Sequence, residues 1–128
     1  MSTIGYKALV HAAEARIRTI AVEEAIDRLG ADDVVFVDLR DVRELKREGG
    51  IPGAFHCPRG LLEFWIDPES PYHHAVFAEP KEFVFFCNLG WRSALAADIA
   101  QQMGLTTCHI GGGFVAWKAS GGDVTNGK

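Results

Sequence analysis

Two short, uninterrupted apolar runs constrain the fold of this 128-residue chain more than any other feature. They are residues 34–37 and 83–86, both rich in aromatic and β-branched side chains. A strand without polar alternation is buried on both faces, which is typical of a parallel sheet covered by helices. The second run passes through a short loop into residues 93–103, an Ala/Leu-rich stretch that predicts a helix ending at Gly104. These runs favour an α/β fold.

The rest of the chain continues the alternation of strand and helix. We expect further strands at 16–20, 54–56 and 106–110, and further helices at about 5–15, 22–29, 41–48, 61–66 and 114–120. Residues 67–80 form a partly helical excursion, and the polar residues 121–128 predict a frayed tail. The chain length fits one domain spanning 1–128. The order of elements predicts a parallel sheet with helices on both faces.

Charge and cysteine content exclude several classes of function. The net charge is −4 and the basic residues do not cluster, which disfavours nucleic-acid binding. No apolar run approaches the roughly 20 residues of a membrane span. Three cysteines without CxxC spacing suggest free thiols in a reducing compartment, so we expect a cytoplasmic protein.

Cys87 opens the loop between the second apolar run and its helix, and it is the candidate catalyst. Loop amides and the helix start can surround its sulfur with donors and favour the nucleophilic thiolate. We expect Gly90 to supply a positive φ. Arg92 stands where the helix dipole disfavours a cation, which suggests that it either binds an anionic substrate or holds the loop open through backbone carbonyls. Ser93 either caps the helix or donates to the sulfur. The substrate-binding residues expected here are Asn88, Leu89, Gly90, Trp91, Arg92 and Ser93.

Several residues outside the loop are expected to support the structure or to border the pocket. Arg40 and Glu44 have the (i, i+4) spacing of a helix ion pair. Asp38, at a strand end, is expected to orient backbone or Arg groups. Arg59, with Trp65, is a candidate for the pocket mouth, where it would supply positive charge. Cys57 and Cys108 lie in or beside strands and are expected to be inert.

Three separated signatures resemble the rhodanese family. They are residues 37–40 with Glu44 and 51–54, residues 86–94 around Cys87, and residues 112–117. The resemblance implies a five-stranded parallel sheet and a cysteine that carries sulfur as a persulfide. It also implies transfer of sulfane sulfur from a donor such as thiosulfate to cyanide or a thiol. Gly50 stands where many members have His, and the loop lacks the basic residue that often follows the cysteine.

The sequence and the resemblance therefore predict a sulfurtransferase of the thiosulfate-using type that acts through Cys87 and needs neither a metal nor an organic cofactor. Its partners would be a small anionic sulfur donor and a thiol or cyanide acceptor, the thiol being free or carried by a protein. One alternative is a persulfide carrier or sensor that docks on a partner protein. Another is a phosphatase or arsenate reductase of the same fold. In phosphatases that resemble this chain, the loop is one residue longer than the four residues between Cys87 and Arg92. The four-residue loop suits a single sulfur atom better.

Overall fold

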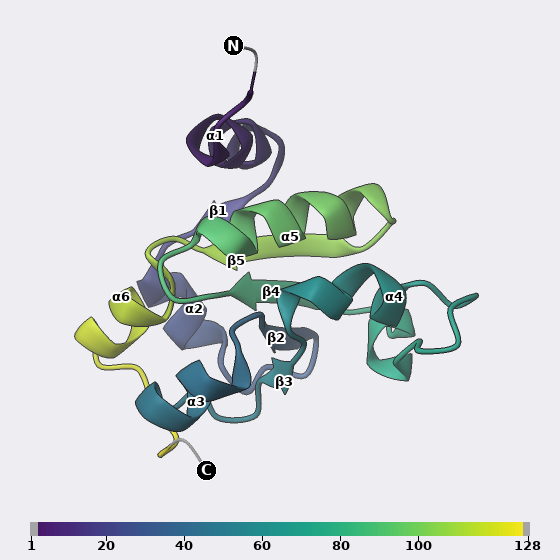
Figure 1. Cartoon of the computed structure of the whole chain (residues 1–128). Helices are drawn as coiled ribbons and strands as arrows, with labels where there is room; N and C mark the ends of the chain where they lie inside the picture. The colour runs from purple at the N-terminus through teal and green to yellow at the C-terminus, as the bar shows by residue number, and fades with distance from the viewer. Residues whose placement is uncertain (1–2, 127–128) are drawn as a thin grey trace.

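A five-stranded, all-parallel sheet forms the centre of the computed structural model, which describes residues 3–126 (Figure 1). Its strand order is β1-β5-β4-β2-β3. The strands are β1 (Thr19–Ile20), β2 (Val34–Asp38), β3 (Phe55–His56), β4 (Glu82–Phe86) and β5 (Thr106–Ile110). The predicted fold class is confirmed, and both apolar runs lie in the middle of the sheet.

Helices cover both faces of this sheet. The α-helices are α1 (Tyr6–Arg16), α2 (Val22–Arg28), α3 (Val42–Glu48), α4 (Leu62–Ile66), α5 (Trp91–Gln102) and α6 (Gly113–Ala119). Two 3-10 turns, η1 (Arg59–Leu61) and η2 (Ala75–Ala78), flank α4 and end the excursion. The predicted helices are confirmed to within one or two residues. The start of α5 at Trp91 rather than Ser93 matters for the site below.

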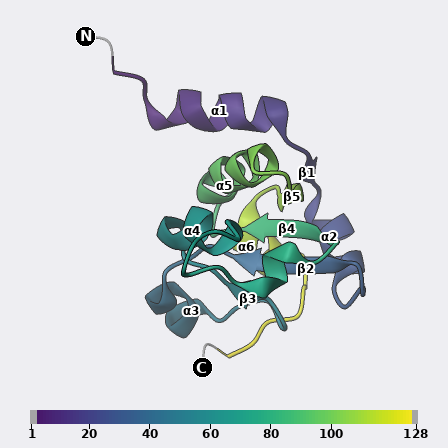
Figure 2. The ribbon, with the colours of Figure 1, turned by 90° about the vertical axis from the view of Figure 1, so that its right-hand side faces the viewer.

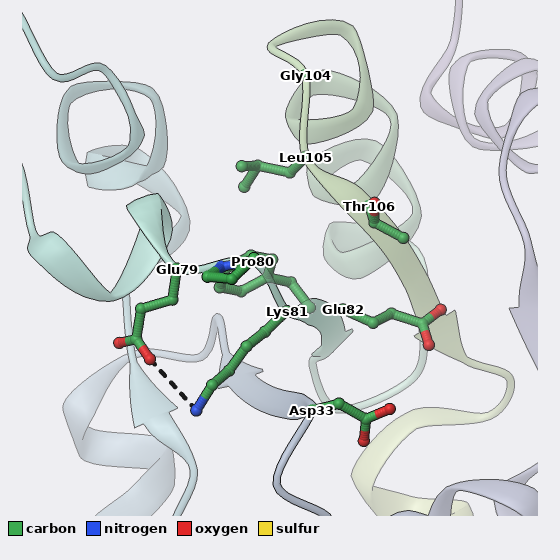
Figure 3. Close-up of a pocket in the computed structure, with 9 residues that line it drawn as sticks. Asp33, Glu79, Pro80, Lys81, Glu82, Gly104, Leu105 and Thr106 are labelled. Carbon is green, nitrogen blue, oxygen red and sulfur yellow. Dashed lines mark ion pairs between the residues drawn. The ribbon is translucent and has the colours of Figure 1, made fainter.

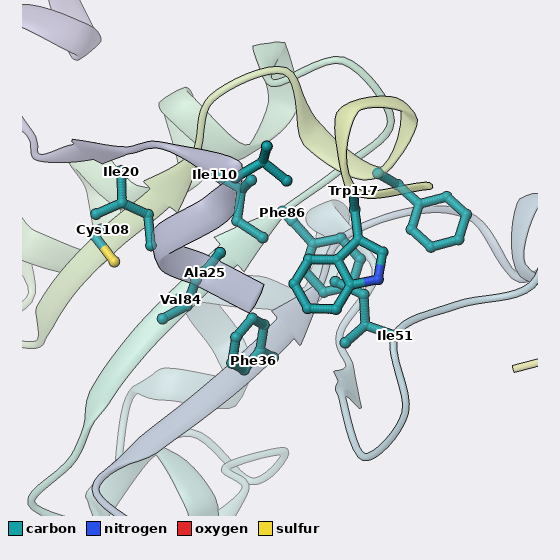
Figure 4. Packing of buried hydrophobic residues seen from close by; sticks show 11 residues of the cluster. Ile20, Ala25, Phe36, Ile51, Val84, Phe86, Cys108, Ile110 and Trp117 are labelled. Carbon is teal, nitrogen blue, oxygen red and sulfur yellow. The ribbon is translucent and has the colours of Figure 1, made fainter. Parts of the chain in front are cut away.

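The side chains of β4 alternate between two apolar clusters. Val84 and Phe86 pack with residues of α2 and α6, including Trp117, in the cluster of Figure 4. Phe83 and Phe85 point to the opposite face and pack with residues of α4, η2 and α5. Because both faces are covered by apolar clusters, residues 83–86 of β4 have no position for a polar side chain, which explains the unbroken hydrophobic run that follows Glu82.

Helix α1 lies outside α5 and does not cover the sheet directly (Figures 1 and 2). Val10 and Ala13 pack against Ala94 of α5. Arg16, the last residue of α1, donates two hydrogen bonds to Asp98 of α5, at 2.9 and 2.6 Å. The Tyr6 ring also packs against Trp91 of α5, and the Gln101 side chain donates to the Arg16 carbonyl, so all of these contacts attach α1 to α5.

Two sequence predictions are wrong at the ends of the molecule. The expected strand at 16–20 shrinks to Thr19–Ile20, because Arg16 still belongs to α1. The tail is not frayed as far as residue 125. Thr125 donates its backbone N–H to the Gly50 carbonyl at 2.8 Å, and the Trp117 indole donates to the Asp123 carbonyl. Residues 127–128 of the predicted tail lie outside the described part. Over residues 3–126, no helix is long and apolar enough to cross a membrane.

Candidate active site

Cys87 immediately follows β4 and opens a four-residue turn, residues 87–90, which we call the cysteine loop. Parallel strands bring their carboxyl ends to one edge of a sheet, which is where α/β folds bind ligands. Gly90 closes the loop as the N-cap of α5 with φ +108°, the positive value predicted for it. An L side chain would be strained in this conformation, so the tight entry into α5 depends on glycine.

Cys87 as a whole residue is 1% exposed, and its sulfur accepts backbone hydrogen bonds from the start of α5. Its donors are the N–H of Gly90 at 3.1 Å and the N–H of Ser93 at 3.4 Å. The Ser93 hydroxyl oxygen lies 3.7 Å from the sulfur. Ser93 is inside the first turn of α5, so the alternative that it caps the helix is wrong. These donors favour a negatively charged sulfur.

A cavity of about 210 Å³ borders Cys87, and we call it the Cys87 pocket. Leu89 and Trp91 are about half exposed at its rim. The lining residues are Glu44, Cys87, Asn88, Leu89, Trp91 and Arg92. The structure therefore brings most of the predicted substrate-binding residues around one thiol.

Arg92 and Glu44 form a two-pronged ion pair beside the sulfur, with N–O distances of 2.8 and 3.0 Å. The hydrogen bonds from Arg92 lower the pKa of Glu44 to about 2, against the opposing effect of burial. The Glu44 carboxylate in turn raises the pKa of Arg92, with a smaller contribution from the Cys87 sulfur. The Cys87 pocket thus holds one cation and one anion.

The predicted ion pair between Arg40 and Glu44 is wrong. Asp41 is the N-cap of α3, so Arg40 lies outside the helix and the (i, i+4) geometry does not apply. The Arg40 guanidinium is fully buried and donates to both carboxylate oxygens of Asp38, at 3.0 and 2.8 Å, and to the Gly49 carbonyl. Asp38 also accepts the backbone N–H of Arg40, so this pair fixes the chain between β2 and α3.

Arg59 does not line the Cys87 pocket, contrary to the prediction. Its guanidinium donates to the carboxylate of Glu63, one helical turn further along, at 3.0 and 3.4 Å. This local partner is available because η1 runs directly into α4. Trp65 packs edge-on against Phe55 and also lies outside the pocket lining.

The N-terminus of α6 holds the cysteine loop from the other side. Phe114 donates its N–H to the Cys87 carbonyl at 2.8 Å, and Val115 donates to the Asn88 carbonyl at 3.1 Å. A Cβ on Gly113 would lie 2.6 and 2.5 Å from those two carbonyl oxygens. Sequence reasoning did not assign Gly113 a role, although the run of three glycines before Phe114 signals a close backbone approach.

His109 of β5 was also missed. It is buried, and its Nδ1 lies 2.9 Å from the Ser93 hydroxyl that approaches the sulfur. The available signal was its place in β5, since the alternation of that strand turns His109 to the same face as Thr107, toward α5. Burial lowers the pKa of His109 to about 4, so the ring is neutral near pH 7.

The other thiols have surroundings unlike that of Cys87. Cys57 and Cys108 are fully buried, and burial raises the pKa of each to about 12. Both remain protonated at neutral pH. Within residues 3–126, no cluster of three or more His, Cys, Asp or Glu residues has the geometry to hold a metal ion.

A larger cavity, of about 400 Å³, lies at the amino ends of β4 and β5 (Figure 3). Its charged lining includes Asp33, Glu82 and the ion pair of Lys81 with Glu79. It lies at the opposite end of β4 from Cys87. The smaller Cys87 pocket, with its thiol and directed amides, is therefore the candidate active site despite its size.

Comparison with known proteins places this geometry in a wider context. The model of the rhodanese-like domain matches residues 21–120. The Bacillus subtilis protein named "Putative sulfurtransferase YtwF" is 29% identical over 102 residues, which are 80% of this chain and 88% of that protein. The human thiosulfate:glutathione sulfurtransferase is 28% identical over 106 residues, or 77% of this chain and 91% of the human protein.

A solved structure from Rhodopseudomonas palustris is similar over almost the full length. It shares 52% identity, covers 98% of this chain and 97% of its own, and superimposes with a TM-score of 0.95. That protein is described as one of unknown function and as a "Possible Tyrosine Phosphatase". The similar proteins thus include two that are named sulfurtransferases and one described as a possible tyrosine phosphatase.

Proposed function

This chain belongs to the rhodanese-like domain family, and from that premise we propose that it is a sulfurtransferase with Cys87 as its nucleophile. One observation carries the proposal. The sulfur lies at the base of a small pocket and accepts two backbone N–H groups from a loop with four residues between Cys87 and Arg92. The relatives named as sulfurtransferases support it.

The first half of the proposed reaction loads the enzyme. The Cys87 thiolate attacks the outer sulfur of a donor such as thiosulfate, forming an S–S bond. The bond between that sulfur and the sulfonate breaks, and its electron pair leaves with sulfite. The amides of Gly90 and Ser93 already point at the sulfur, so they stabilise negative charge there without rearrangement. Asn88, Leu89, Trp91 and Arg92 bind the donor around it.

The second half regenerates the thiolate. An acceptor, either cyanide or a thiolate, attacks the terminal sulfur of the Cys87 persulfide. The S–S bond to Cys87 breaks, and its electron pair returns to the Cys87 sulfur. The exposed rim of Leu89 and Trp91 leaves the pocket open to an acceptor, which can be a small molecule or a thiol on another protein. No metal or organic cofactor enters either half.

A protein phosphatase is the second candidate, favoured by the description of the Rhodopseudomonas palustris relative. A phosphate group has three peripheral oxygens that need donors around it. Here two backbone N–H groups reach the sulfur, and the four residues between Cys87 and Arg92 make a loop that suits a single sulfur atom better than a tetrahedral group. These features support sulfur transfer over phosphate hydrolysis.

Mass spectrometry of the intact protein tests the proposal. Treatment with thiosulfate should add one sulfur atom, about 32 Da, which cyanide or a reducing agent removes. Cys87→Ser should not gain this mass, whereas Cys108→Ala should gain it as the wild type does, because burial keeps the Cys108 thiol protonated. Loading of Cys87→Ser would overturn the proposed nucleophile.

Turnover assays separate the alternatives. We expect Cys87-dependent thiocyanate formation from thiosulfate and cyanide to exceed hydrolysis of an aryl phosphate. The reverse order would favour the phosphatase. Loading without turnover, relieved only by a thiol-bearing protein, would favour a persulfide carrier.

A further inference from the structure

His109 is a buried, titratable group that the proposed reaction leaves unused. Its side chain lies on β5 between two hydroxyl groups, one at each ring nitrogen. Nδ1 is 2.9 Å from the Ser93 hydroxyl, and Nε2 is 3.0 Å from the Thr19 hydroxyl. A neutral imidazole carries one N–H and one acceptor nitrogen, so it must donate to one hydroxyl and accept from the other.

The two hydroxyl groups connect this ring to the sulfur and to the surface. The Ser93 oxygen lies 3.7 Å from the Cys87 sulfur, and both residues are buried. Thr19, on the edge strand β1, is exposed to solvent. The sulfur, Ser93, His109 and Thr19 thus form a continuous series of polar contacts from Cys87 to the surface, and these three partners do not line the Cys87 pocket.

We propose that Ser93, His109 and Thr19 are a hydrogen-bonded relay that carries the Cys87 proton to solvent and turns the Ser93 hydroxyl into a donor to the thiolate. This inference rests on the proposed function, because it assumes that Cys87 must lose a proton before it attacks. The relay requires a defined direction for each of its hydrogen bonds.

In the thiol state, every donor in the relay points outward. Cys87 S–H donates to the Ser93 oxygen, Ser93 O–H donates to His109 Nδ1, and His109 Nε2–H donates to the Thr19 oxygen. In the thiolate state every bond is reversed. Thr19 O–H donates to Nε2, Nδ1–H donates to Ser93, and Ser93 O–H donates to the sulfur.

The change between the two states releases one proton and creates no charged intermediate residue. The Cys87 proton moves to Ser93, the Ser93 proton to Nδ1, the Nε2 proton to Thr19, and the Thr19 proton to water. His109 is neutral before and after and changes only its tautomer. This fits a ring whose burial holds its pKa at about 4, because a protonated imidazolium is not required.

The relay also supplies a route that bound substrate does not block. In the described part of the chain, the hydrogen-bonding partners of the sulfur are two backbone amides and the Ser93 hydroxyl, none of which is a base. The one carboxylate in the pocket lining, Glu44, is engaged by Arg92. When a sulfur donor occupies the pocket, the Ser93 hydroxyl is the contact through which the Cys87 proton can leave.

The tautomer of His109 is a direct readout that a merely structural histidine would not change. Nitrogen NMR distinguishes a protonated from an unprotonated ring nitrogen. We expect the proton to reside on Nε2 while Cys87 is a thiol and on Nδ1 once Cys87 ionises. In Cys87→Ser it should remain on Nε2 throughout. A His109 tautomer that is the same before and after Cys87 ionisation would overturn the relay.

A matched pair of variants at Thr19 tests the outer end, where no pocket residue is touched. Thr19→Val keeps the branched shape but leaves Nε2 without a hydroxyl partner. We expect iodoacetamide to alkylate Cys87 about fivefold more slowly at pH 7, as for the loss of one neutral hydrogen bond. Thr19→Ser should react within about twofold of the wild type. Wild-type reactivity of Thr19→Val would also overturn the relay.

Neither measurement involves sulfur transfer. A tautomer change with a slow Thr19→Val supports the relay even if thiosulfate never loads Cys87, in which case the proposed function fails alone.

Discussion

The Glu44 carboxylate contacts two elements at once, the start of α3 and Arg92 of α5. One oxygen accepts the backbone N–H of Asp41 at 2.9 Å and completes the capping box of α3. Both oxygens also accept from Arg92 of α5. Because its pKa falls from 4.5 to about 2, this pair stabilises the fold fully above about pH 4.5, and that contribution is lost as the pH falls through about 2.

Removing the negative charge of Glu44 should strengthen the binding of an anionic sulfur donor. Glu44→Gln keeps an oxygen to accept from Asp41 but removes the anion from the Cys87 pocket. We expect the KM for thiosulfate to fall about two- to fivefold with little change in kcat, the modest size reflecting a partly exposed Arg92. Steady-state kinetics measures both parameters.

Glu48→Gln is the control for that experiment. Glu48 carries the same charge on the same helix but does not line the pocket, so its KM should match the wild type. An unchanged KM in Glu44→Gln would mean that the donor binds away from the pair or is not an anion.

Residue pairing was the part of the site that the sequence predicted least well. The strand–loop–helix pattern identified Cys87 and Gly90, because their roles depend on neighbours close in sequence. Glu44 and Arg92 are 48 positions apart, and their contact follows from how α3 and α5 pack. The spacing of Arg40 and Glu44 was misleading because Asp41 starts the helix between them.

At the scale of elements, α6 determines the shape of the cysteine loop. Its first N–H groups bind the Cys87 and Asn88 carbonyls and so fix the loop in the conformation in which the Gly90 N–H donates to the sulfur. Gly113 has φ +61° and no room for a Cβ. The close approach of α6 therefore depends on this glycine.

Gly113→Ala should impair both stability and activity. We expect a loss of at least about 2 kcal/mol in the free energy of unfolding, combining the positive-φ cost with the clash against the loop carbonyls. Thiosulfate loading of Cys87 should slow at least tenfold, because the loop must shift. Chemical denaturation and mass spectrometry measure the two effects.

Gly53→Ala provides the comparison for Gly113. Gly53 also has a positive φ, of +76°, but a Cβ there meets nothing within 4 Å. It should lose only about 1–2 kcal/mol and load sulfur at the wild-type rate. Equal loading by the two variants would contradict the role of α6 in shaping the loop.

The elements themselves were largely predictable, and the exceptions have physical reasons. Apolar runs placed β2 and β4, the charged stretch 41–48 placed α3, and the Ala/Leu-rich stretch that ends at Gly104 placed α5. Strand β1 is shorter than its alternating sequence suggests because the helical register of α1 extends through Arg16, which pairs with Asp98. The tail is ordered through backbone bonds to Gly50, which its polar composition does not signal.

At the scale of the whole molecule, α1 is attached differently from the other helices. In the described part of the chain it packs on α5 alone, through a few apolar side chains, the Tyr6–Trp91 ring contact, the Arg16–Asp98 ion pair and one hydrogen bond from Gln101. Arg16 lowers the pKa of Asp98, so this pair is complete above the ordinary value of 3.8 and is lost as the pH falls through the lowered folded value. The helix should open without unfolding the sheet.

Hydrogen exchange should show this independence. We expect the amides of α1 to exchange faster than those of β4, and Asp98→Asn to accelerate α1 further, about two- to fivefold, since Arg16 is half exposed. β4 should be unaffected. Asp27→Asn, an exposed change on α2, is the control and should alter neither element. Equal protection of α1 and β4 would show that they unfold together.

The hydrogen bonds between α6 and the cysteine loop limit which new substrates this site can acquire by mutation. An inserted residue between Cys87 and Arg92 would widen the loop, but it would also pull the Cys87 and Asn88 carbonyls away from Phe114 and Val115. A single insertion would leave those groups without partners before any new substrate could benefit. Evolution toward a larger substrate, or engineering for one, would therefore have to alter the loop and the C-terminal helix in the same step.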